Sequence, residues 1–242
     1  MNTLQTKTVG QMVTENIKTA HIFKKYNIDF CCGGGISIQK ACERANVSFD
    51  DLASDLQNLD QPKSRATDYN NWDLDFLIDH IINIHHRYVE ENILMLVQYG
   101  TKVAKVHGER HPELLKIQEL FAMVATELSG HLRKEELILF PFIKKMLQAK
   151  KENTSLARPQ FGKVDHPIKM MEVEHEEAGA ILKKIAKLSN NYTPPEGACN
   201  TYRAFFSKLD EFEQDLHQHV HLENNILFPK ALQLEKTIQY FE

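Results

Sequence analysis

Four long segments of the chain place apolar residues at alternating steps of three and four, and strand-like alternation is almost absent. This spacing gathers the apolar side chains on one face of an α-helix, so each segment is predicted to be a helix with one buried face. The connections between the segments are short and contain Gly or Pro, which favours an all-α, up-down four-helix bundle. The predicted helices cover residues 73–106, 112–148, 165–190 and 197–234.

Polar residues interrupt each of the four apolar faces. Two faces carry a His-x-x-x-Glu pair followed by Leu-Phe-Pro, in HLRKEELILFP at 131–141 and HVHLENNILFP at 219–229. The other two carry a lone histidine, 45 residues before the first pair and 44 before the second, which indicates an internal duplication. The candidate residues are His86, His131, Glu135, His175, His219 and Glu223.

These six side chains are predicted to converge in the core and to bind metal. A single core histidine usually finds an ordinary partner, but six buried polar groups in register would each cost on the order of 1–3 kcal/mol if left unpaired. Structural zinc takes four ligands at one ion, whereas six ligands suit two ions. Two divalent ions and two glutamates leave a positive excess that an oxo or hydroxo bridge neutralises, and imidazole-rich sites suit iron, with manganese second. The prediction is two non-haem iron ions bridged by Glu135 and Glu223; the alternative is a metal-free helical interaction protein.

The proline after each glutamate is predicted to disturb its helix. Pro141 and Pro229 lack an N–H and leave a carbonyl unpaired four residues earlier, so both helices should kink one to two turns after the glutamates. The kinks would either re-aim groups near the metal or simply bend each helix around its core.

The first 60 residues are predicted to form a separate, small helical domain. It surrounds KKYNIDFCCGGG, where the three glycines are expected to end a helix and permit a tight turn. A polar linker with one proline follows, and the bundle domain covers residues 72–242. Cys31 and Cys32 are candidates for a thiol role if a helix N-terminus lowers their pKa, and otherwise they only pack. Cys42 and Cys199 are expected to be packing residues.

Composition excludes several classes of partner. The net charge is −4, the pI is near 6.3, and Lys and Arg are scattered, so neither nucleic acid nor a membrane surface is an expected partner. The N-terminus has no apolar signal segment, and no apolar run is long enough to span a membrane. Adjacent cysteines suit a reducing compartment, so the predicted location is the cytoplasm.

The order of these residues resembles a known family. The two His-x-x-x-Glu pairs with their lone histidines and Leu-Phe-Pro are similar to the hemerythrin-like domains, and YNIDFCCGGG is similar to the N-terminal Cys-Cys-Gly-Gly module of the RIC (repair of iron centres) proteins. The two features together cover nearly the whole chain. The resemblance implies a di-iron bundle with four histidine ligands, two bridging glutamates and, at Gly179, no fifth histidine of the kind that oxygen-carrying hemerythrins use.

The resemblance also implies a function. It predicts repair of iron–sulfur clusters damaged by nitrosative or oxidative stress, by donating iron or by reducing nitric oxide at the di-iron site. The implied partners are damaged iron–sulfur proteins, with nitric oxide or oxygen as small ligands, and the N-terminal module suggests a homodimer. The alternative from another class is a module that binds or senses oxygen, nitric oxide or iron without turnover.

The remaining polar residues of the faces are assigned outside the metal site. His86 is preferred to His85 as the first-helix ligand because it shares the apolar face, whereas His85 lies about 100° round an α-helix. Glu90 is expected at the surface. Four histidines are candidates for contacts that orient the ligands, and most of them are expected to face solvent: His80, His85, His217 and His221.

Overall fold

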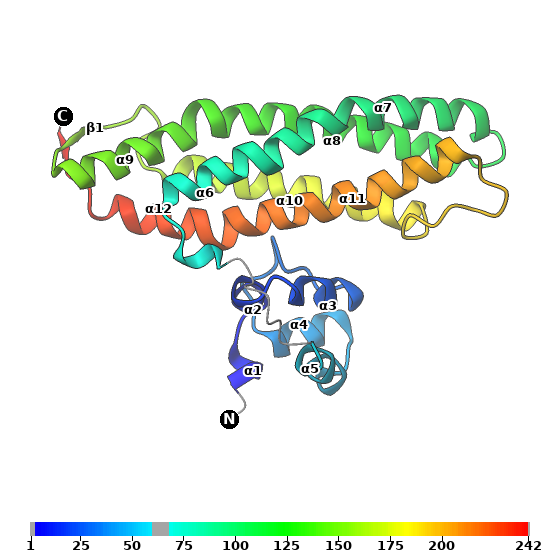
Figure 1. Ribbon diagram of the computed structural model, residues 1–242, viewed down its shortest axis with the longest axis horizontal. Helices are drawn as coiled ribbons and strands as arrows, with labels where there is room; N and C mark the ends of the chain where they lie inside the picture. Colours follow the sequence, from blue (N-terminus) through cyan, green and yellow to red (C-terminus); the bar gives the residue numbers. More distant parts are fainter. Residues whose placement is uncertain (1–2, 60–67, 242) are drawn as a thin grey trace.

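The structure is a computed structural model that describes residues 3–59 and 68–241. It has a bundle of four long helices and a smaller group of short helices, which Figure 1 shows in blue below the bundle. The predicted class, an all-α protein with an up-down four-helix bundle, is confirmed. Residues 60–67 of the predicted linker lie outside the described residues, and so do the outermost residues of the two predicted domains.

Each long helix begins and ends within a few residues of its predicted range. The first consists of α6 (Leu74–His80), η2 (Ile81–His86) and α7 (Arg87–His107), and the second of α8 (Glu113–Lys134), η3 (Glu135–Leu139) and α9 (Phe140–Glu152). The third is α10 (Asp165–Leu188), and the fourth consists of α11 (Asn200–Leu222), η4 (Glu223–Leu227) and α12 (Phe228–Glu235). A short helix η1 (Tyr69–Asn71) precedes the bundle, and β1 (Leu156–Ala157) pairs in parallel with β2 (Tyr240–Phe241).

Three of the long helices contain a π-helical segment, in which the N–H bonds the carbonyl five residues back. The segment η3 begins at Glu135, and η4 begins at Glu223. Each ends just before the helix that carries Pro141 or Pro229 near its first position. A wide turn therefore starts at each glutamate and ends before each proline, while the kink predicted after the glutamates stays a prediction. π-Helical segments inside α-helices frequently mark functional sites.

The π segments change which residues face the core. Continued α-helical spacing after Glu135 would bury Ile138, but Ile138 is 48% exposed and Leu139 is buried in its place. A π turn holds one more residue than an α turn, so the buried face moves by one position. In η2 the same widening lets the adjacent His85 and His86 both be buried.

The apolar core of the bundle is divided by the polar residues. One cluster of buried side chains contains Val89, Phe121 and Phe212, and the other contains Ile78, Phe140 and Phe228. Along each long helix the polar candidates lie between the two clusters, so the bundle surrounds them with packed hydrophobic layers on both sides. Within the described part of the chain, none of the helices combines the length and the apolar character that a membrane span requires.

The small N-terminal group consists of five short helices. They are α1 (Thr3–Thr6), α2 (Val9–Glu15), α3 (Thr19–Lys25), α4 (Ile38–Ala45) and α5 (Phe49–Gln57). Side-chain caps start several of them, including a capping box in which Thr8 and Gln11 bond each other's backbone N–H. The prediction that the three glycines end a helix is wrong, because α3 ends before Asn27, which has a left-handed φ of 54°. The glycines lie in the loop between α3 and α4.

This loop attaches the N-terminal helices to the bundle. The side-chain amide of Asn225 in η4 donates to the carbonyl of Cys31 at 3.1 Å. Phe30 meets the ring of His217 edge-on at 5.7 Å between centroids, and Lys24 forms an ion pair with the buried Glu213 at 3.2 Å. The Cys-Cys loop is therefore fastened to the π segment that begins at Glu223.

We expect Gly34→Ala to destabilise this attachment and Gly35→Ala to leave it unchanged. A Cβ at Gly34 would lie 2.4 Å from the carbonyl oxygen of Phe30, whereas one at Gly35 would meet nothing within 4 Å. Overpacking of this kind costs about 1–3 kcal/mol. Thermal unfolding followed by circular dichroism checks this; equal midpoints for the two variants would contradict the close approach.

Candidate metal centre

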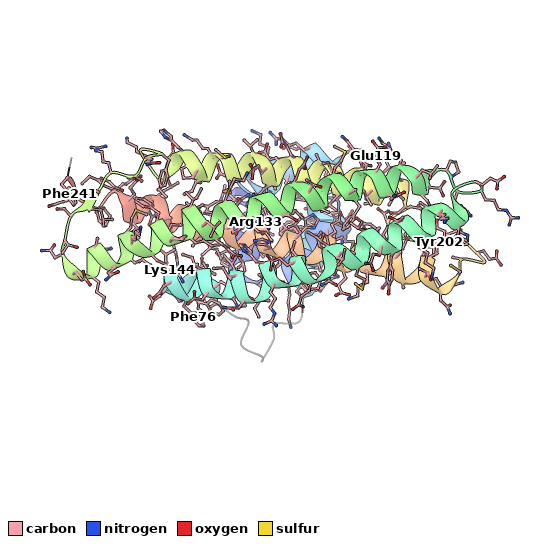
Figure 2. All side chains as sticks on the ribbon, turned by 90° about the horizontal axis from the view of Figure 1, so that it is seen from above. Phe76, Glu119, Arg133, Lys144, Tyr202 and Phe241 are labelled. Atoms are coloured by element: carbon pink, nitrogen blue, oxygen red, sulfur yellow. The ribbon has the colours of Figure 1, made fainter. Side chains whose placement is uncertain are left out.

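The six candidate residues come from all four long helices and meet in the middle of the bundle. Each helix contributes one histidine, and the two glutamates are the first residues of η3 and η4. All six are buried, with at most 3% of any residue exposed. Figure 2 views the bundle from above, with α8 in front, and labels the exposed Arg133 on the helix that carries His131. Covering helices thus separate the cluster from solvent on this side.

The ligand atoms form two overlapping groups of four. One group is His86, Glu135, His219 and Glu223, and in it the ligand atoms lie within 4.8 Å of one another. The other group is His131, Glu135, His175 and Glu223, with the same limit. Both glutamates belong to both groups, so each carboxylate stands between two pairs of histidines.

Individual distances show how the carboxylates are shared. The Oε1 of Glu223 lies 3.0 Å from Nε2 of His219, and its Oε2 lies 3.2 Å from Nε2 of His175. The Oε2 of Glu135 lies 3.4 Å from Nε2 of His86 and 3.4 Å from Nε2 of His131. Each carboxylate therefore faces one histidine of each group, as a carboxylate that bridges two cations must.

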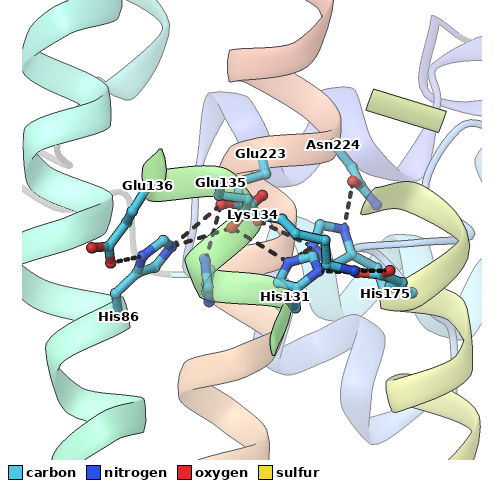
Figure 3. Close-up of polar contacts among 10 residues, drawn as sticks. His86, His131, Lys134, Glu135, Glu136, His175, Glu223 and Asn224 are labelled. Atoms are coloured by element: carbon cyan, nitrogen blue, oxygen red, sulfur yellow. Dashed lines mark hydrogen bonds and ion pairs between the residues drawn. The ribbon is translucent and has the colours of Figure 1, made fainter. Parts of the chain in front are cut away.

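Three of the histidines are oriented by a hydrogen bond on the side away from the centre (Figure 3). Their Nδ1–H groups donate to Glu136 at 2.7 Å from His86, to Glu174 at 2.8 Å from His131, and to Asn224 at 2.9 Å from His175. Lys134 in turn forms an ion pair with Glu174. Such contacts fix the ring so that Nε2 points inward, and they are typical of histidines that bind metal.

Several buried atoms of the cluster have no hydrogen-bond partner among the described residues. They are both carboxylate oxygens of Glu135, Oε2 of Glu223 and Nε2 of His86. Leaving such groups unpaired in a protein core costs about 1–3 kcal/mol each, and more for a charge. A bound cation would satisfy all of them, so the residues fit a metal. Mixed imidazole and carboxylate donors suit iron better than magnesium or calcium, which prefer oxygen ligands alone.

The histidines around Glu135 and Glu223 favour the ionised form of both buried carboxylates. Burial lowers the pKa of His86, but Glu135 and Glu223 outweigh it and raise that pKa to about 10. Burial also lowers the pKa of His131, which Glu135 in particular raises to about 9. Burial raises the pKa of Glu223, yet His219 and His175 hold it well below its ordinary value. Without metal, protons on His86 and His131 thus balance the carboxylates, and a metal would displace these protons.

A cavity beside one end of the cluster opens to the surface between α8 and α10. It encloses about 240 Å³ and is lined by His131, Lys134, Glu174 and two further glutamates, Glu127 and Glu177. A Cβ at Gly130, which also lines it, would meet nothing within 4 Å. The cavity therefore brings solvent and small ligands up to His131, past carboxylates that attract cations.

The two adjacent cysteines form a separate group with Asp29. The Sγ of Cys31 donates to Asp29 at 3.2 Å, and the two sulfur atoms are 3.9 Å apart. They lie in the loop after α3 and not at a helix N-terminus, so the predicted means of forming a thiolate is absent. The Cys32 thiol, burial and the charge of Asp29 raise the pKa of the Cys31 thiol well above its ordinary value. The condition for a helix-activated thiolate is therefore not met at Cys31, and the thiol role stays a prediction.

Other residues differ from their predicted surroundings. Most of the four additional histidines are expected to face solvent, but His85 and His221 are buried and His80 and His217 are half-buried. Cys199 was expected to pack in the core, but it is exposed and lies 3.2 Å from His107. Glu90 is exposed and Cys42 is buried, as predicted.

The residues that orient the histidines were not identified from the sequence, although the repeat contains a signal for two of them. Glu136 follows Glu135, and Asn224 follows Glu223, so they occupy matching places in the two halves. Each bonds the lone histidine of its own half. A polar residue directly after each glutamate of the two His-x-x-x-Glu pairs was the available clue.

Comparisons with known proteins agree with this site. Residues 77–231 match the hemerythrin HHE cation binding domain, and residues 5–60 match ScdA_N, described as a domain of unknown function (DUF542). A "Probable iron-sulfur cluster repair protein" of Haemophilus influenzae is 37% identical over 213 residues, which are 87% of this chain and 90% of that protein. The "Iron-sulfur cluster repair protein YtfE" of Yersinia pseudotuberculosis is 34% identical over 229 residues, which are 95% of this chain and 98% of that protein.

The YtfE protein of Escherichia coli O81 is 36% identical over 225 residues, 93% of this chain and 96% of that protein. These relatives extend over both matched segments, and the predicted resemblance is confirmed. The chain therefore belongs to the family of iron–sulfur cluster repair proteins, and it carries an ScdA_N domain followed by a hemerythrin HHE cation-binding domain.

Proposed function

We propose that the cluster holds two iron ions bridged by Glu135 and Glu223, and that the protein uses this centre to repair damaged iron–sulfur clusters in other proteins. The observation that carries the proposal is that two groups of four donors share both carboxylates. Two sites built from six side chains need such sharing, because each ion then has four protein donors. The names of the relatives, which refer to iron–sulfur cluster repair, support the second part.

The residues of the site have separate tasks in this proposal. The four histidines and two glutamates would hold the ions, while Glu136, Glu174 and Asn224 keep three of the imidazoles aimed inward. When bound, a reduced iron pair would supply two electrons, which together with two protons balance the conversion of two nitric oxide molecules into nitrous oxide and water. The cavity that reaches His131 is the proposed place where small ligands enter and where iron that serves as cargo leaves.

Repair is tested by mixing the iron-loaded protein with an iron–sulfur enzyme whose cluster has been damaged by nitric oxide. We expect recovery of the enzyme's activity with the loaded protein and with its Glu90→Gln variant, and little recovery with the metal-free protein. The surface position of Glu90 makes that variant a control for substitution as such. If free iron at the same concentration restores the enzyme equally well, the proposed function fails.

We expect the reduced, iron-loaded protein to convert nitric oxide into nitrous oxide rather than only to bind it. Gly179 leaves open space where a side chain would lie one turn after His175, since a Cβ there meets nothing within 4 Å. In this proposal, a small ligand approaches the site from this space, one turn from His175. Gas chromatography of the headspace measures the product, and an absorbance change without nitrous oxide would support binding or sensing without turnover.

For the cysteines we propose a role in the repair reaction and not in holding the iron pair. Cys31 and Cys32 form their own group with Asp29, while the loop is tied to η4 through Asn225. We expect the double variant Cys31→Ser, Cys32→Ser to keep the iron content of the unchanged protein and to lose most of its ability to restore the damaged enzyme. Full recovery with the double variant would refute the thiol role.

We also propose that the protein acts in the cytoplasm, and as a homodimer. All four cysteines are unpaired, which suits a reducing compartment. The proposal of a homodimer is based on the resemblance, and the mass of the full chain measured by analytical ultracentrifugation tests it.

A further inference from the structure

The contacts that orient the histidines follow the two-fold repeat, except at His219. Glu136 and Asn224 are matching residues and serve His86 and His175. His131 is served by Glu174, which directly precedes the lone histidine of the other half. By the same symmetry, the residue directly before His86 should accept a hydrogen bond from His219. That residue is His85, so the expected carboxylate is replaced by an imidazole.

His85 does not take over the task of a carboxylate directly. Its ring is stacked parallel to that of His219, with centroids 5.6 Å apart and an interplanar angle of 8°. No hydrogen bond joins the two rings, because Nε2 of His85 has no partner among the described residues. The Nδ1 of His219 is buried and has no hydrogen-bond partner in the part of the chain that the structure describes. His219 is thus the one candidate ligand in that part with no outer partner.

Asp215 lies one helical turn before His219 on α11, and its carboxylate forms a hydrogen bond with His85. It precedes His219 by four residues on α11, so the two side chains share one face, one turn apart. The Oδ1 of Asp215 lies 3.0 Å from Nδ1 of His85. Its Oδ2 is buried and, like Nε2 of His85, has no partner among the described residues. A buried acceptor and a buried donor therefore both lack a partner at this place.

Aromatic residues close this place from outside. His80 packs on His85 with ring centroids 5.6 Å apart, and Trp72 packs on His80 at 5.0 Å. Buried polar groups that lack a protein partner are commonly paired through a buried water molecule with two to four polar partners. The neighbouring unpaired groups of Asp215, His85 and His219 supply such partners.

We propose that Asp215, clamped by His85, is the positioning residue for His219 and that one water molecule joins its Oδ2 to the Nδ1–H of His219. This arrangement replaces the direct carboxylate contact that Glu174 gives to His131. This inference rests on the proposed function, because it requires that His219 binds a metal ion. Its task is to hold Nε2 of His219 toward Glu223, to which it lies at 3.0 Å.

The test is a titration of the metal-free full-length protein with Co²⁺, followed by absorption. The unchanged protein should bind two ions, which appear as two phases of the absorption change during the titration. The His175→Gln and His86→Gln variants show which phase belongs to which group of donors. We expect Asp215→Ala to weaken the His86–His219 ion by about 10–100-fold, the range found for such outer contacts, and to leave the other ion unchanged. Asp215→Asn keeps an acceptor oxygen and should restore most of the affinity.

Controls separate positioning from a general loss of structure. Glu211→Gln changes a surface carboxylate on the same helix and should bind both ions normally. His85→Phe keeps the aromatic shape but releases Asp215, so it should weaken the same ion even if Asp215→Ala does not fold. Three results overturn the inference but not the proposed function. They are normal binding of both ions in both Asp215→Ala and His85→Phe, equal weakening of both ions, and no recovery of affinity in Asp215→Asn. An unchanged protein that binds no Co²⁺ overturns it together with the proposed function.

Discussion

Replacing Glu135 by Gln removes most of the iron from the protein, whereas replacing Glu90 by Gln leaves the iron content unchanged. Glu135 belongs to both groups of donors, and its carboxylate is completely buried. An amide in its place lacks the negative charge and offers one weak oxygen donor, so both ions lose a ligand at once. Because substitutions in the outer contacts of metal sites already cost about 10–100-fold in affinity, we expect the loss here to exceed about 100-fold.

The measurement is iron per chain after anaerobic reconstitution and removal of loosely bound metal. We expect about two irons in the unchanged protein and in Glu90→Gln, since two ions are the number that the shared donors can hold. Glu90 is one turn after His86 but exposed, so it matches Glu135 in chemistry and differs from it in burial. Equal iron contents in the Glu135 and Glu90 variants would refute the assignment.

Removing the metal lowers the thermal stability of the protein by a large amount. An ion that binds only the folded chain stabilises it by about 2.7 kcal/mol when its concentration is 100 times its Kd, and two ions by about 5 kcal/mol. For a chain of this size, each kcal/mol moves the midpoint by about 2–4 °C, so chelation should lower it by about 10–20 °C. Differential scanning calorimetry measures the shift.

The same experiment on Glu135→Gln provides the control. Because this variant does not retain iron, adding iron should leave its midpoint nearly unchanged. The metal-free unchanged protein and the metal-free variant should then unfold at similar temperatures. A shift of the variant as large as that of the unchanged protein would mean that iron stabilises the chain from another place.

The bundle and the six candidate residues could be predicted because both follow from regular spacing. An apolar face repeated at three and four residues defines a helix, and a histidine in that face must be buried when the helix packs. The repeat of the His-x-x-x-Glu pairs then places the candidates at one level. These arguments need only α-helical geometry, which holds along most of the four long helices.

The errors arise where α-helical geometry does not hold. An α-helix turns about 100° per residue, which would bury Ile138 and turn His85 away from the apolar face, but η3 and η2 are π-helical. No residue pattern in these segments distinguishes an i to i+5 bond from an i to i+4 bond. The wide turns depend on how the glutamates and histidines meet across the bundle, which is a property of the packed structure.

The surroundings of the cysteines could not be predicted from the sequence either. A Gly-rich stretch shows that the backbone can turn, but not that the turn lies against another domain. The contact between Asn225 and the Cys31 carbonyl joins residues 194 positions apart. Similarly, Glu174 serves His131 from another helix, and only the fold brings them together.

Anomalous diffraction at the iron edge from crystals of the iron-loaded protein tests the central claim most directly. We predict two peaks per chain, about 3.5–4 Å apart as in other two-metal sites. One should lie beside Nε2 of His86 and His219, the other beside Nε2 of His131 and His175, with the carboxylates of Glu135 and Glu223 between them. A single peak, or iron bound away from these side chains, would contradict the account.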